Sequence, residues 1–166
     1  MAFINEDTMM RKRLHLIVLW FLLLAGGSVN AALPGVTVQS LKGTFDQVRE
    51  RLVTAIENRG LVVAYTAHVG AMLERTGKDI GQPRQIYANA EVLEFCSAGL
   101  SRSMMEANPH NIVFCPYTIA IYVLPNEAGK VYIAYRKPLA TGSARSMRAL
   151  REVGKLLDAI VVEALK

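Results

Sequence analysis

From residue 36 onward the chain first alternates apolar and polar side chains and then changes to a helical repeat. Residues 36–41 alternate and are rich in β-branched side chains, which predicts a strand. Thr44 and Gln47 have the spacing of a capping box, so a helix is expected to begin there. Asn58-Arg59-Gly60 is expected to end that helix. Its apolar face is Phe45, Val48, Leu52, Ala55 and Ile56.

Further strands and two short helices are expected between residues 61 and 136. The apolar, β-rich segments that predict strands are 61–67, 85–96, 112–114, 118–123 and 131–135. Residues 68–76 predict a short helix whose inward side chains are Val69, Met72 and Leu73. Ser97 is placed to cap a second helix that runs to about Ala107.

The last segment, residues 143–165, predicts a long amphipathic helix. Its apolar stripe consists of Met147, Leu150, Val153, Leu157, Ile160, Val161 and Ala164. A linker separates this C-terminal region, 141–166, from the domain expected over 32–140, so the helix packs either on that domain or on a second copy. Strands and helices intermix with hairpins. The predicted fold is therefore α+β, with a mainly antiparallel sheet packed by two or three helices plus the C-terminal helix.

Residues 1–31 have the order of features found in a secretory signal peptide. Basic residues at 11–13 precede an apolar run at 14–25, which includes His15. This run of 12 positions is shorter than the roughly 20 residues that span a bilayer. Small residues follow, so cleavage is predicted after Ala31 and a periplasmic or secreted location is expected. If the leader stays uncleaved, it alone would hold the protein to the membrane.

The charge of the chain argues against a nucleic-acid partner. The net charge is +5, and removal of the leader's three basic and two acidic residues lowers it to +4. No long basic run and no basic stretch interleaved with aromatic residues is present. The aromatic and basic residues at 132–137 suit either an anionic ligand or a solvated strand face.

Two cysteines, Cys96 and Cys115, follow the leader, and three interpretations of them are open. In an oxidising compartment they would form a disulfide, which stabilises a loop of this size by about 3 kcal/mol if the two Cα atoms lie within about 7 Å. Alternatively, the helix expected at Ser97 favours a Cys96 thiolate, and hence a nucleophile, a redox thiol or a soft-metal ligand. In the third interpretation both thiols are buried and inert.

His68 and Met72 form a second candidate group. They are four residues apart, so on a helix they share a face. A histidine and a methionine together can bind haem iron or copper. The alternative is that Met72 belongs to the core and His68 caps the helix.

Several segments together resemble one known family. They are Gly43-Thr44-Phe45-Asp46-Gln47-Val48, Asn58-Arg59-Gly60-Leu61, Phe95-Cys96-Ser97-Ala98 and Phe114-Cys115-Pro116-Tyr117. Over residues 36–138 the chain resembles the domain of unknown function 302 family in its exported bacterial form. The resemblance implies a small α+β domain, usually paired as a homodimer, and implies no established activity.

Three functions follow from these observations. The first is an exported, non-enzymatic accessory domain that binds a small ligand or a redox cofactor, haem or a soft metal, near Cys96, Cys115, His68 and Met72. The second is a thiol-dependent redox protein or enzyme that uses Cys96 and meets a redox partner. The third is a structural homodimer with a Cys96–Cys115 disulfide. No paired carboxylates and no Ser-His-Asp set stand out as catalytic residues.

Overall fold

The computed structural model describes residues 35–166, so the predicted leader lies outside the described residues. Within them the strands form one five-stranded antiparallel sheet with the order β1-β5-β4-β3-β2. The strands are β1 (Val36–Lys42), β2 (Val63–Ala67), β3 (Asn89–Phe95), β4 (Tyr117–Val123) and β5 (Lys130–Arg136). The helices are α2 (Phe45–Glu57), α3 (Val69–Asp79), α4 (Ala98–Ala107), the 3-10 helix η1 (Pro109–Phe114) and α5 (Ala144–Ala164). The predicted α+β class is confirmed.

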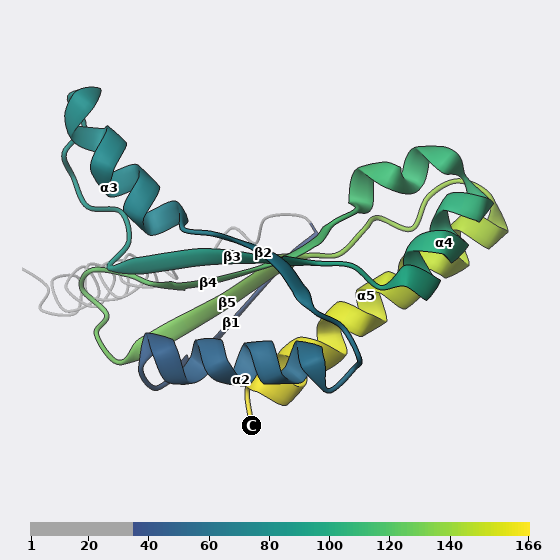
Figure 1. The fold of residues 1–166 in the computed structure, drawn as a ribbon, viewed down its shortest axis with the longest axis horizontal. Helices are drawn as coiled ribbons and strands as arrows, with labels where there is room; N and C mark the ends of the chain where they lie inside the picture. The colour runs from purple at the N-terminus through teal and green to yellow at the C-terminus, as the bar shows by residue number, and fades with distance from the viewer. Residues whose placement is uncertain (1–34) are drawn as a thin grey trace, which may run out of the picture. The chain divides into compact units, whose positions relative to one another are not determined.

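Helices α2 and α5 lie along one face of the sheet, as Figure 1 shows. The side chains that the three central strands direct toward them are buried: Leu93, Phe95, Tyr117, Ile119, Ile121, Val131, Ile133 and Tyr135. Because successive strand residues point to opposite faces, the intervening residues form a second face that α2 and α5 do not cover. We call it the open face. Its residues include Val38, Val92, Ala120, Tyr122, Tyr132 and Ala134.

The helix starts agree with the sequence signals. Thr44 and Gln47 form the predicted capping box, in which the Thr44 Oγ1 accepts from the Gln47 N–H and the Gln47 Oε1 accepts from the Thr44 N–H, each at 3.3 Å. Ser97 caps α4 by accepting from the Leu100 N–H. Gly60 follows α2 with a φ of +68°, a conformation that glycine adopts without steric cost.

Two expectations about local structure are wrong. Residues 112–114, predicted as a strand, belong to η1, because the Asn108 side chain accepts from the His110 N–H and Pro109 preorganises the first turn. Met72, predicted to point inward, is 40% exposed. Helix α3 extends from the end of the sheet (Figure 1), so no second layer covers its outer side.

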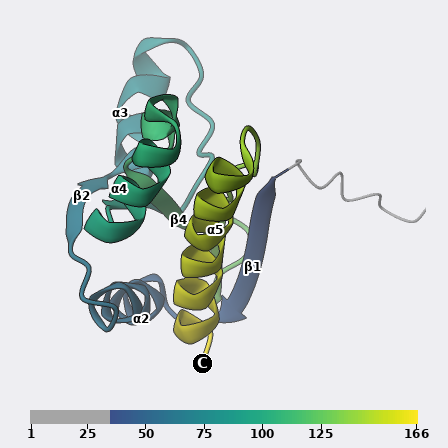
Figure 2. The same cartoon turned by 90° about the vertical axis from the view of Figure 1, so that its right-hand side faces the viewer.

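The C-terminal helix is part of the core. Helix α5 packs against α2 and α4 (Figure 2), and the side chains buried along it include Leu150, Val153, Leu157 and Ile160. Of the two positions left open by the sequence, packing on its own domain is therefore the one that the structure adopts.

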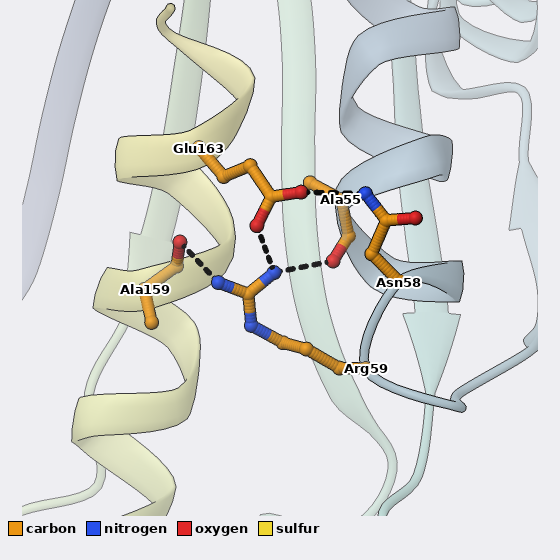
Figure 3. Close-up of polar contacts among 5 residues, drawn as sticks. All are labelled: Ala55, Asn58, Arg59, Ala159 and Glu163. Atoms are coloured by element: carbon orange, nitrogen blue, oxygen red, sulfur yellow. Dashed lines mark hydrogen bonds and ion pairs between the residues drawn. The ribbon is translucent and has the colours of Figure 1, made fainter.

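Arg59 links the C-terminal ends of α2 and α5 (Figure 3). Its Nη1 donates to the Ala55 carbonyl and pairs with a Glu163 oxygen, each at 2.6 Å, and its Nη2 donates to the Ala159 carbonyl at 2.8 Å. Asn58 Nδ2 donates to the other Glu163 oxygen at 2.7 Å. One guanidinium thus satisfies carbonyl groups of both helices and a carboxylate. Hydrogen bonds from Asn58 and Arg59 hold the pKa of Glu163 below its ordinary value.

Replacing Arg59 by Ala should lower the free energy of unfolding by about 2 kcal/mol, because hydrogen bonds to a charged group are lost and two helices lose their link. Urea unfolding monitored by circular dichroism measures the change. Arg148→Ala, which removes an exposed arginine of α5, is the matched control and should change stability by less than about 0.5 kcal/mol. Equal effects of the two variants would contradict the role assigned to Arg59.

Candidate functional site

The register between β3 and β4 brings the two cysteines together. Phe95, the last residue of β3, lies opposite Tyr117, the first residue of β4. Cys96 directly follows β3 and Cys115 lies two residues before β4, so the two cysteines lie at the same end of this strand pair although 19 positions separate them in the chain. Cys96 directly precedes the Ser97 cap of α4, and Cys115 follows η1. We call Cys96 and Cys115 the cysteine pair.

The two sulfur atoms are in direct contact. The structure holds both residues as free thiols, with their Sγ atoms 2.8 Å apart, about 0.8 Å more than a disulfide bond length. Cys96 is exposed and Cys115 is half-buried. Ser101 Oγ lies 3.7 Å from the Cys115 sulfur and 3.1 Å from the Tyr117 hydroxyl. A small movement suffices to join the two sulfurs.

The surroundings of Cys96 favour the neutral thiol. Although Cys96 is exposed, partial desolvation of its sulfur by neighbouring protein atoms is the largest cause, followed by a hydrogen bond with Cys115 and repulsion from the charged form of Cys115, and together they raise the pKa of Cys96 to about 11. This is the opposite of one of the three interpretations of the cysteines, a thiolate favoured by the N-terminus of α4. Cys96 does precede that helix, but desolvation together with the contact with Cys115 raises its pKa. A Cys96 nucleophile at neutral pH is therefore disfavoured.

His68 and Met72 do not belong to this site. His68 Nδ1 lies 3.2 Å from an oxygen of Glu91, whose other oxygen accepts from Arg49 Nε at 2.6 Å. Glu91 precedes Cys96 by five residues along β3, a separation of about 17 Å. Figure 1 shows α3, which carries Met72, and α4 at opposite ends of the sheet. The four residues predicted to hold one ligand are thus divided between two places.

This division changes the expectation about cofactors. Among residues 35–166, no group of three or more histidine, cysteine or acidic side chains is placed to hold a metal ion. The cysteine pair supplies two soft ligands, and the imidazole and thioether expected to complete a haem or soft-metal site lie elsewhere. The donor set therefore does not fit a single haem or soft-metal site near all four of these residues.

Sequence reasoning did not find Ser101 and Tyr117 as neighbours of the cysteine pair. Tyr117 is buried against Phe95, with the two rings edge to face and their centroids 6.0 Å apart. Burial is the largest cause that raises the pKa of its hydroxyl group. The sequence shows only that Tyr117 lies two residues after Cys115. That spacing does not reveal which residue of β3 pairs with Tyr117, so the contact with the cysteine pair could not be predicted.

The fold and site define a small α+β domain that carries a pair of adjoining thiols at one end of an antiparallel sheet. The chain belongs to the family described as Domain of unknown function DUF302, whose profile matches residues 36–164. The match includes the whole of α5, beyond the residues 36–138 that carry the resemblance in the sequence.

A solved structure confirms the fold. The chain is similar to the crystal structure of an uncharacterized conserved DUF302 protein from Bacillus stearothermophilus, with a TM-score of 0.66 and 16% sequence identity. The similarity covers 81% of this chain and 100% of the other. No curated protein gives a match. In the part of the chain that the structure describes, no helix has both the length and the apolar character needed to cross a membrane.

The raised pKa predicts slow alkylation of Cys96 in the reduced protein. At pH 7.5 iodoacetamide should modify it about 100-fold more slowly than a free cysteine, because the thiolate fraction falls tenfold for each unit between a pKa of 9.0 and one of about 11. Quenched samples analysed by peptide mass spectrometry give the rate. The rate should keep rising up to about pH 11.

Cys115→Ser is the informative control for this measurement, since it removes the neighbouring sulfur while leaving α4 in place. In this variant Cys96 should react faster at pH 7.5 than in the parent protein. Rapid alkylation of the folded parent protein at neutral pH would contradict the assignment.

Proposed function

We propose that this protein is an exported domain whose cysteine pair cycles between dithiol and disulfide. The single observation that carries the proposal is the 2.8 Å contact between the sulfur atoms of Cys96 and Cys115. The apolar leader at residues 14–25 supports export to an oxidising compartment, where such a pair meets disulfide oxidants.

The proposed reaction is thiol–disulfide exchange with a partner disulfide. The Cys96 thiol, which is exposed, loses its proton and attacks one sulfur of the partner, forming a mixed disulfide and releasing one partner thiolate that takes up the proton. Cys115 then displaces the second partner thiolate in the same way. The pair loses two electrons and two protons, and the partner disulfide gains both. The raised pKa of Cys96 makes the first step slow at neutral pH.

A structural disulfide is the competing function, and the half-buried position of Cys115 favours it. A bridge would join the residue that follows β3 to Cys115, two residues before β4, closing the loop that contains α4 and η1. The two functions differ in reduction potential. Structural disulfides have potentials below about −300 mV, whereas exposed and reactive ones have higher potentials.

The redox proposal is tested by equilibrating the full chain in glutathione buffers of graded potential, then alkylating the free thiols in denaturant and determining the intact mass. A reversible transition above about −300 mV is expected. Cys96→Ser and Cys115→Ser each leave a single thiol and should show no such transition. A potential below that limit would identify the bridge as structural, and absence of any intramolecular bridge would exclude both functions.

The proposal includes a homodimer formed through the open face of the sheet. Val38 is 49% exposed there, and the rings of Tyr122 and Tyr132 stack at a centroid distance of 5.1 Å. Ala120 and Ala134 lie opposite each other in the row next to this tyrosine pair, and Val38 lies beside Ala134, so small and apolar side chains adjoin the aromatic ones. This apolar centre of the open face suits a second copy of the same sheet.

Ala120→Arg should convert the dimer into a monomer, because it places a charge at the centre of the open face on the middle strand. Sedimentation equilibrium at micromolar concentration measures the mass. Val162→Arg is the control, since Val162 is 56% exposed on α5 and outside the open face. A monomeric parent protein, or an equal effect of both substitutions, would contradict this interface.

A further inference from the structure

A groove lies at the end of the sheet where β4 begins and β5 ends. Its volume is about 530 Å³, which is in the range of small-molecule sites. Its walls come from η1, the start of β4, the end of β5, the 138–140 linker and α5. We call it the linker groove.

The linker groove is lined mainly by apolar side chains, two of which are unusually exposed. Val113 of η1 is 76% exposed and Leu139 of the linker is 75% exposed, and both line the groove. Phe114 and Leu157 also contribute to its walls. Large apolar groups left this open to water at one concave place are typical of a surface that binds something.

One of the two cations that line the groove has no ion-pair partner among residues 35–166. Arg136 and Lys137 both line it. The Lys137 ammonium pairs with Asp158 at 2.8 Å. Within residues 35–166, the Arg136 guanidinium makes no ion pair and no side-chain hydrogen bond. Arg136 is exposed, so the groove combines apolar walls with one positive group that a ligand can reach.

We propose that the linker groove binds a small amphiphilic carboxylate. The apolar part of the ligand packs against Val113, Phe114 and Leu139, and its carboxylate pairs with Arg136. A planar guanidinium can donate two parallel hydrogen bonds to a carboxylate, and this pairing distinguishes the acid from a neutral molecule of the same shape. A single available cation in a groove of this volume suits a small anion better than a highly charged macromolecule.

Decanoate and its uncharged counterpart decanol are the probes, titrated into the full chain by isothermal calorimetry. Decanoate is expected to bind saturably at one site per chain and more tightly than decanol. Arg136→Ala should weaken decanoate binding by about tenfold or more while leaving decanol binding unchanged. Leu139→Asp should weaken the binding of both probes.

Lys42→Ala is the matched control, because Lys42 is an exposed cation on the neighbouring strand β1, at the opposite end of the sheet from Arg136. It should leave both affinities unchanged. Absence of saturable decanoate binding would overturn the proposal, as would equal weakening by Lys42→Ala and Arg136→Ala. Self-association that Leu139→Asp abolishes, without a saturable decanoate site, would assign the groove to a second copy and would also overturn it.

The ligand proposal does not depend on the cysteine pair. Cys96→Ser should bind decanoate with the affinity of the parent protein. A protein that fails the redox test but passes this titration would retain the groove as a binding site, and the reverse result would retain only the redox function.

Discussion

The antiparallel pairing of β3 with β4 determines where the chemical groups of this domain lie. With Phe95 opposite Tyr117 and Leu93 opposite Ile119, the apolar residues of both strands face α2 and α5. A shift of this register by one residue would turn those side chains to the open face. The same pairing brings Cys96 to Cys115 and leaves Glu91 near the other end of β3, beside His68. Core packing and the position of the cysteine pair therefore have one cause.

The long helix α5 completes this arrangement from the other side. The buried side chains of α5 cover one face of the sheet and exclude water from it. Arg59 joins the last turns of α5 to the end of α2. Asp158 of the same helix accepts a hydrogen bond from the Tyr135 hydroxyl and pairs with Lys137, so α5 is also connected to the end of β5. This second connection leaves Arg136 as the cation available in the linker groove. The ion pair between Lys137 and Asp158 thus leaves Arg136, rather than Lys137, to pair with an anion in the groove.

The cysteine pair combines two properties that favour different chemistry. The contact between the sulfurs favours formation of a bond, whereas the raised pKa of Cys96 disfavours the thiolate needed to begin exchange. Such a pair would bridge without being a strong nucleophile toward other molecules. The proposed reversible disulfide therefore differs from a reactive single thiol, the interpretation based on the position of Cys96 before a helix.

The sequence by itself determined the elements whose signals are local. The capping box at Thr44, the cap at Ser97 and the apolar stripe of α5 depend on residues within a few positions of one another, and the structure confirms each of them. The apolar residues 112–114 were wrongly predicted as a strand because the Asn108 and Pro109 signals for a 3-10 helix compete with their β propensity. Only the tertiary structure decided which distant residues meet. The contact of Cys96 with Cys115, the separation of His68 and Met72 from them, and the linker groove all depend on strand register and helix placement. These are set by burial of apolar surface summed over the whole chain, a quantity that no short segment contains.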